Sequence, residues 1–260
     1  MLRFERRWSS FGCRCAKTSP HFPGALSSLQ AFADPRFSAD ADLSSANSIN
    51  LGRLLPQMTY FARASLQTAR AHGETLSFVV PSGNLGHVTA CLWAKRLGFP
   101  IGEIVLAHNA NRALLDYLES GDWRPRRSVA TLASAMDVGA PSNAERLFHL
   151  FPDVAALRAA VSAYVVEDDA IRARLKQGFA DFGQIWCPHT AVAAEAHARH
   201  GAAGRWAIVA TAHAGKFREI VEPLIGREVA LPPALAALMS RGVAKTEIAP
   251  DISALAAVLG

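Results

Sequence analysis

From about residue 51 onward, hydrophobic positions alternate between helical spacing and short continuous apolar runs. Residues 51–72 repeat apolar side chains at helical spacing, and Pro56 falls early in that helix, where its missing N–H is tolerated. The run LSFVV at 76–80 is typical of a buried parallel strand. The same pattern predicts strands at 101–109 and 206–211, helices at 88–98, 111–120 and 215–226, and a peripheral helical segment at 151–182.

Strands that alternate with helices predict an α/β fold with a parallel sheet covered by helices on both faces. In such sheets, ligands bind at the carboxyl ends of the strands. Two loops follow predicted strands in this way, at 81–87 and 211–216. We therefore expect the functional site to be built from these two loops.

Composition and charge exclude several classes of protein. The 260 residues are 50% hydrophobic and 19% charged, which is enough for a core and excludes a disordered chain. The net charge is +5, but residues 1–17 alone hold five basic residues and one acidic residue, so little charge remains for a nucleic-acid surface. No apolar run reaches membrane-spanning length. We expect a cytoplasmic protein with no nucleic-acid or membrane partner.

The N-terminal segment and the cysteines add little chemistry. Residues 1–24 are basic, rich in serine and poor in acidic residues, as in a transit peptide, although we favour a disordered N-terminus, which has the same composition. Cys13 and Cys15 have the wrong spacing for a zinc knuckle, and Cys91 and Cys187 lie in apolar segments as expected of buried thiols. The histidines show no shared ligand pattern, so we predict no metal site.

Residues 82–87, Ser-Gly-Asn-Leu-Gly-His, form a glycine-rich loop between a predicted strand and a predicted helix. Gly83 and Gly86 leave backbone N–H groups unobstructed, and the following helix directs the positive end of its dipole at the loop. Such a unit can cradle a phosphate monoester. The Gly-Lys-Ser/Thr of a Walker A loop is missing, and an ordinary tight turn explains the glycines equally well.

Two other segments carry candidate chemistry. Thr211 stands at the end of the third predicted strand, where its hydroxyl can pair with a ring nitrogen or cap the next helix. Lys216 lies at a helix start, an unfavourable place for a cation, and we interpret it as a solvated residue. Three polar residues lie around the N-terminus of the first predicted helix: Asn47, Ser48 and Arg53. They form either an N-cap or a donor set for a phosphate dianion.

Taken together, these segments resemble the threonine synthase family, pyridoxal-phosphate (PLP) enzymes of fold type II. The likeness is carried by residues 45–57, 79–90, 94–114, 131–147, 188–193 and 211–219, which follow the family's order and approximate spacing. It implies the three-layer, parallel-sheet large domain of a fold type II PLP enzyme, truncated at the N-terminus. Residues 1–24 would be an atypical N-terminus, 25–50 a remnant of the small domain, and 51–260 the PLP-binding large domain.

The resemblance also implies an activity and a set of roles. The activity is that of a lyase in threonine biosynthesis, which converts O-phospho-L-homoserine and water to L-threonine and phosphate with pyridoxal 5'-phosphate as cofactor. The cofactor phosphate would be held by Ser82, Gly83, Asn84, Leu85 and Gly86, and the cofactor ring nitrogen by Thr211. The substrate phosphate would be bound by Asn47, Ser48 and Arg53.

The sequence also departs from the family pattern. Leu85 and His87 stand where the family usually has Phe and Asp, and Cys187 replaces an acidic residue. The family's Schiff-base lysine and its Ser-Gly-Asp-Thr-Gly loop do not occur in this sequence, so no catalytic residue is assigned. We interpret the chain first as a partial threonine synthase. The alternatives are one subunit of a split enzyme, completed by a separate N-terminal chain, and a non-catalytic module that binds phosphate or PLP.

Overall fold

The computed structural model describes residues 35, 48–239, 253, 254 and 257. The chain divides into two compact units, one of residues 46–239 and one that combines residues 1–45 with 240–260. The first unit contains the sheet and the helices that pack on it. The predicted segment 1–24, most of 25–50 and the site residue Asn47 lie outside the described residues, so the predicted domain boundaries stay predictions.

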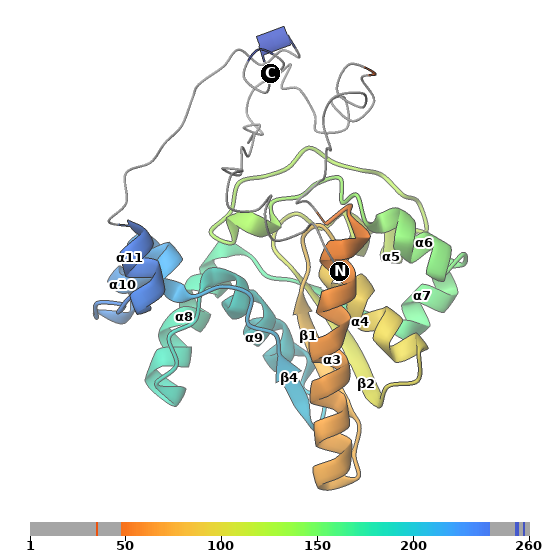
Figure 1. The fold of residues 1–260 in the computed structure, drawn as a ribbon, viewed down its shortest axis with the longest axis horizontal. Helices are drawn as coiled ribbons and strands as arrows, with labels where there is room; N and C mark the ends of the chain where they lie inside the picture. The colour runs from red at the N-terminus through yellow and green to blue at the C-terminus, as the bar shows by residue number, and fades with distance from the viewer. Residues whose placement is uncertain (1–34, 36–47, 240–252, 255–256, 258–260) are drawn as a thin grey trace, which may run out of the picture. The chain divides into compact units, whose positions relative to one another are not determined.

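The centre of this unit is a four-stranded sheet in which every pair of neighbouring strands is parallel (Figure 1). Its strands are β1 (Leu76–Pro81), β2 (Ile101–His108), β3 (Ser162–Val165) and β4 (Trp206–Ile208). Their order in the sheet is β3-β2-β1-β4. In register, Val79 of β1 lies opposite Val105 of β2 and Ile208 of β4. The parallel α/β fold predicted from the sequence is confirmed, and the carboxyl ends of β1, β2 and β4 meet at one edge of the sheet.

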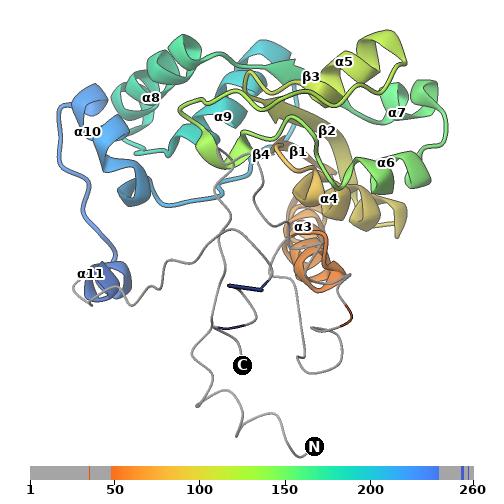
Figure 2. The same cartoon turned by 90° about the horizontal axis from the view of Figure 1, so that it is seen from above.

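Helices cover both faces of the sheet (Figure 2). On one face lie α3 (Leu51–His72) and α4 (Gly86–Arg96), and on the other α8 (Asp168–Phe182) and α9 (Pro188–His200). Side chains of β1 alternate between two hydrophobic clusters, since Phe78 and Val80 point to the α3–α4 face and Val79 points to the α9 face. No helix in the part of the chain that the structure describes is long and apolar enough to cross a membrane.

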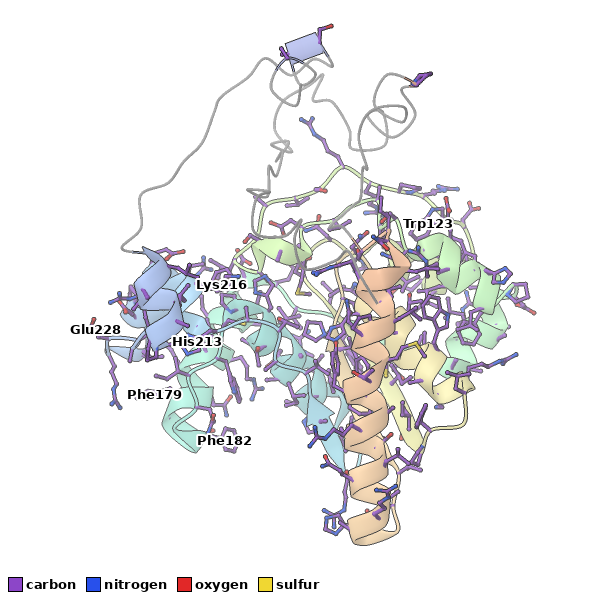
Figure 3. The ribbon with its side chains drawn as sticks, in the orientation of Figure 1. Trp123, Phe179, Phe182, His213, Lys216 and Glu228 are labelled. Atoms are coloured by element: carbon purple, nitrogen blue, oxygen red, sulfur yellow. The ribbon has the colours of Figure 1, made fainter. Side chains whose placement is uncertain are left out.

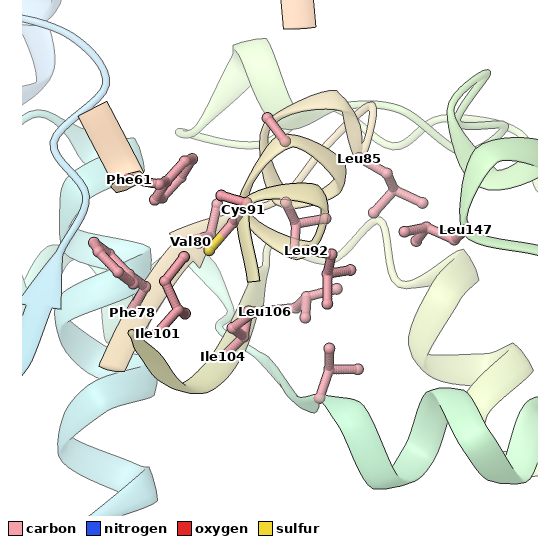
Figure 4. Close-up of a cluster of buried hydrophobic side chains, with 14 of the residues drawn as sticks. Phe61, Phe78, Val80, Leu85, Cys91, Leu92, Ile101, Ile104, Leu106 and Leu147 are labelled. Atoms are coloured by element: carbon pink, nitrogen blue, oxygen red, sulfur yellow. The ribbon is translucent and has the colours of Figure 1, made fainter. Parts of the chain in front are cut away.

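The hydrophobic cluster between the sheet and helices α3 and α4 stabilises these two helices (Figure 4). Phe61 of α3 is fully buried and packs edge-on against Phe78 of β1, with ring centroids 5.0 Å apart. Helix α3 begins where the Asn50 side chain accepts a hydrogen bond from Gly52 N (2.9 Å) and ends at Gly73, whose φ is 69°. The helix predicted at 51–72 therefore has the expected bounds.

Shorter elements complete the unit. They are α5 (Ala113–Ser120), α6 (Ala144–Leu150), α7 (Val154–Ala160), α10 (Arg218–Ile225), α11 (Pro233–Met239) and the two 3-10 turns η1 (Ser134–Met136) and η2 (Ala214–Phe217). The segment predicted as helical at 151–182 also contains β3, which sequence reasoning missed. β3 has only four residues, too few to show a strand period inside a helical segment, and its pairing is supplied by β2.

The third predicted strand, 206–211, is shorter than expected. β4 ends at Ile208, and its last main-chain bond to β1 runs from Val209 N to Val79 O (3.0 Å). β1 continues two residues further, to Pro81, without pairing to β4 there. Thr211 therefore lies three residues beyond the strand rather than at its end. The strand is half-buried rather than buried, because within the described residues β4 has a neighbour on one side only.

Candidate functional site

A cleft of about 560 Å³ opens at the carboxyl ends of β1 and β4. Its lining includes six of the residues predicted for the site: Ser48, Gly83, Asn84, Leu85, Gly86 and Thr211. Helix α3 contributes Gln57 and Tyr60 to the same lining, and α4 contributes His87. Segments that are far apart in the sequence thus meet at the edge of the sheet where parallel α/β folds bind ligands.

The loop after β1 presents unpaired main-chain donors. Leu85 has φ of 63° and ψ of −3°, and it is the one non-glycine residue with positive φ among those the structure describes. Within that part of the chain, the N–H groups of Gly83, Leu85 and Gly86 have no acceptor. Helix α4 begins at Gly86, so its dipole adds positive potential at the same place. The arrangement is suited to binding an anion such as a phosphate ester.

Neighbouring segments fill the space where side chains would stand at the two glycines of this loop. A Cβ atom built on Gly83 would lie 2.7 Å from Met136 Cα, a main-chain atom of η1. A Cβ built on Gly86 would lie 3.1 Å from Ser48 Cβ and 3.2 Å from Asn143 Nδ2. The sequence predicts glycine here to free the backbone for a ligand, and the structure shows that close packing also requires it.

Ser82, which was predicted to bind the cofactor phosphate, directs its donors to the sheet. Its N–H donates to Ala107 O (2.8 Å), its hydroxyl donates to Val80 O (2.8 Å), and only 1% of the residue is exposed. Both donors are used within the sheet, so Ser82 offers no donor to a ligand. It attaches the start of the loop to β2 instead.

Ser48 and Asn84 belong to a polar network that joins three segments. Asn84 Nδ2 donates to Ser48 Oγ (2.6 Å), and Asn84 Oδ1 accepts from Ser142 N (2.7 Å). Asn143 Nδ2 also donates to Ser48 Oγ (3.1 Å), and Arg146 donates to Ile49 O (2.6 Å). The Asn84 side chain thus fixes the loop rather than standing free above it. Sequence reasoning missed Asn143 and Arg146, although the polar run SNAER at 142–146 is a visible signal.

The remaining predicted residues are less closely tied to the cleft. Thr211 lines it and is exposed. Arg53 lies in the first turn of α3, is exposed, and its side chain makes no hydrogen bond or ion pair in the part of the chain described. Lys216, which the sequence suggests is a surface residue, is exposed in η2 near α10 and does not line the cleft (Figure 3).

A second polar network holds the segment that packs against Gly83. Asp137 Oδ1 accepts from Asn109 Nδ2 (2.7 Å), Thr131 Oγ1 (2.7 Å) and Asn111 Nδ2 (3.1 Å), while its Oδ2 accepts from Thr131 N (3.0 Å). Asn109 directly follows β2 and is fully buried. The network therefore anchors Met136, the neighbour of Gly83, to the carboxyl end of the sheet.

Burial keeps the histidines around the site neutral. It lowers the pKa of His87 to about 4, and it lowers the pKa of His108 to about 4 despite a hydrogen bond to the Ser82 main chain that acts in the opposite direction. Burial also lowers the pKa of His189, whose Nε2 accepts from Ala135 N (3.0 Å). Near pH 7 these imidazoles therefore act as uncharged hydrogen-bonding groups.

The buried histidines predict a loss of stability in mild acid. An unfolded imidazole binds a proton below about pH 6.5, whereas folded His108 does so only near pH 4, so the free energy of unfolding should fall as the pH drops from 6.5 to 4. For His108 alone the loss is at most roughly 3 kcal/mol. Urea unfolding at several pH values measures it. His108→Gln should flatten this slope and the exposed-site control His149→Gln should not. Equal slopes in both variants would contradict the prediction.

Among the described residues, no three His, Cys, Asp or Glu side chains gather in a way that could hold a metal ion. Cys91 and Cys187 are buried free thiols, which confirms their predicted environment. The site thus combines a loop with unpaired main-chain N–H groups, a hydroxyl and a set of neutral polar side chains.

Comparison with known proteins agrees with this geometry. A family profile described as "Threonine synthase, C-terminal" matches residues 190–259. The chain is 39% identical to the threonine synthase of Serratia marcescens over 208 residues, which cover 80% of this chain and 48% of that protein. It is 34% identical to the threonine synthase of Escherichia coli over 227 residues, which cover 87% of this chain and 53% of that protein.

Solved structures of threonine synthases are also similar to this chain. The crystal structure of PLP-bound threonine synthase from Brucella melitensis superposes with a TM-score of 0.81 at 30% identity, over 89% of this chain and 55% of that chain. The E. coli enzyme superposes with a TM-score of 0.79 at 34% identity, over 88% and 54%. The chain spans about half the length of the curated relatives it matches. Over that shared length, the chain is similar to threonine synthases in both sequence and fold.

Proposed function

We propose that this chain supplies the cofactor-binding part of a threonine synthase, a PLP-dependent lyase that converts O-phospho-L-homoserine and water to L-threonine and phosphate. The observation that carries the proposal is the cleft itself, which brings the loop 83–86, Thr211 and Ser48 together at the carboxyl edge of a parallel sheet. The relatives' name and the PLP in the Brucella melitensis structure support the reaction and the cofactor. A cytoplasmic location is part of the same proposal.

The donor set fits the phosphate ester of PLP. The N–H groups of Gly83, Leu85 and Gly86 would hold its oxygens, and the N-terminus of α4 would favour their charge. The Thr211 hydroxyl would pair with the ring nitrogen and, being neutral, would leave that nitrogen largely unprotonated. When bound, PLP supplies an electron sink that stabilises negative charge on carbon.

Substrate binding is proposed at the Ser48 side of the cleft. Ser48 lines the cleft, and Arg53 presents an exposed guanidinium one turn into α3. An arginine with hydroxyl and amide donors is a good set for a phosphate dianion, and Asn47 would complete it. These residues would orient the phosphate that leaves during the reaction.

Equilibrium dialysis of the purified chain against PLP tests the proposal. We expect one bound equivalent, and no phosphate release from O-phosphohomoserine by this chain by itself, because its sequence lacks the Schiff-base lysine motif. Adding a separately expressed N-terminal half of the E. coli relative should restore release if the two parts assemble. Binding without restored release would favour the non-catalytic module, and absence of PLP binding would contradict the proposal.

Thr211→Val should weaken PLP binding by about three- to tenfold, the effect of losing one neutral hydrogen bond of roughly 1 kcal/mol while the size of the side chain is kept. Dialysis measures the dissociation constant. Thr75→Val is a matched control, because Thr75 is exposed just before the amino end of β1, away from the cleft. Equal affinity in the Thr211 variant and the wild type would show that the hydroxyl makes no such bond.

A further inference from the structure

His87 lies on the wall of the cleft and is paired with a residue of another helix. It is the second residue of α4, and its Nε2 is hydrogen-bonded to the Tyr60 hydroxyl of α3. The two rings meet edge-on with centroids 5.6 Å apart, and Phe61 lies 5.2 Å from the imidazole. Contacts on these sides fix the ring, so its remaining nitrogen has a defined place in the wall.

The chemistry of the pair determines which nitrogen carries the proton. Burial raises the pKa of Tyr60, so the phenol keeps its hydrogen, and burial lowers the pKa of His87 to about 4, so the imidazole is neutral. A phenol O–H is a better donor than its oxygen is an acceptor, and a neutral imidazole has one accepting nitrogen. The hydroxyl therefore donates to Nε2, which leaves the hydrogen on Nδ1.

The Nδ1 atom is available to a ligand. It has no hydrogen-bond partner within the part of the chain that the structure describes, and it is not among the buried unpaired atoms there. His87 follows the anion loop directly in sequence, and Gly83, Leu85 and Gly86 line the same cleft. A side-chain donor thus lines the same cleft as the loop that carries the unpaired main-chain N–H groups.

We propose that His87 is a ligand-binding residue whose Nδ1–H donates to an anionic oxygen of the phosphate monoester held by the loop 83–86, and that Tyr60 sets the tautomer required for this. The inference rests on the proposed function and deepens it, because it adds a side-chain donor to a cradle otherwise made of main chain. Tyr60 is a positioning residue and His87 a contact residue.

Two measurements test this proposal, the affinity for PLP and phosphate and the tautomer of His87. Equilibrium dialysis against PLP and against inorganic phosphate should show about five- to tenfold weaker binding for His87→Phe, which keeps an aromatic ring without the N–H, and a smaller loss for Tyr60→Phe. The exposed His149→Gln should bind like wild type. In ¹⁵N-labelled wild-type protein, the His87 Nδ1 should resonate as a protonated nitrogen and shift when phosphate is added.

The outcomes separate this inference from the proposed function. A wild-type chain that binds no PLP would overturn both. A wild-type chain that binds PLP at a site abolished by Gly83→Ala, with unchanged affinity in His87→Phe, would overturn the inference and leave the function standing. A His87 protonated on Nε2 in the ¹⁵N spectrum would also overturn it, and this measurement stays decisive if the His87 variant does not fold.

Discussion

Replacing Gly83 with alanine should weaken PLP binding by at least about 100-fold. The new Cβ would lie 2.7 Å from Met136 Cα, a separation that real Cβ atoms essentially never show. Met136 is 4% exposed and its N–H is bonded to Ala133 O (2.9 Å), so the strain falls on backbone rather than on a flexible side chain. The loop 83–86 must move to relieve this clash, and the movement displaces its main-chain donors. Two misplaced donors to a charged oxygen reduce the binding free energy by roughly 3 kcal/mol.

The measurement is dialysis against PLP, with urea unfolding to show that the variant is folded. Gly52→Ala is the matched control, since Gly52 lies at the start of α3 and a Cβ there has its closest contact, 3.2 Å, with the Asn50 side chain. The control should bind PLP like wild type. A folded Gly83→Ala chain with wild-type affinity would show that the cradle lies elsewhere.

Local patterns were sufficient to predict the elements that carry most of the core. The helix at 51–72 and the strands at 76–80 and 101–109 match the structure within a residue because their apolar side chains repeat at helical or strand spacing over a long enough run. The predictions for β3 and for the end of β4 were wrong for the same reason. Their pairing is set by the neighbouring strand, and a four-residue segment has too few side chains to show a period.

The candidate site was predictable where it depends on backbone freedom and not where it depends on tertiary contacts. Gly83 and Gly86 could be singled out because glycine between a strand and a helix has a local meaning. The hydrogen bonds of Ser82 could not be predicted, because the backbone of the sheet accepts from both of its donors. Asn143 bonds Ser48 across 95 positions of sequence, a distance at which no spacing rule operates.

Asp137→Ala should lower the free energy of unfolding by about 3 kcal/mol, because it removes a carboxylate that accepts hydrogen bonds from three different residues. Asn109 is fully buried, so its amide would lose a charged acceptor that water cannot replace. The carboxylate also fixes the residue next to Met136, on which the shape of the loop at Gly83 depends. PLP affinity should therefore fall together with stability. Urea unfolding measures the first effect and dialysis against PLP the second.

Asp169→Ala is the matched control, because the Asp169 side chain is 99% exposed and forms an ion pair with Arg172 (2.8 Å), an interaction that solvent screens. It should leave both stability and PLP affinity unchanged. The informative comparison is whether the two losses in Asp137→Ala occur together. If stability falls and PLP affinity does not, the polar network supports the fold alone, and the loop at Gly83 keeps its shape without it. If both fall, the carboxylate links the end of β2 to the cleft, and the anion site depends on a buried network that no local sequence pattern reveals.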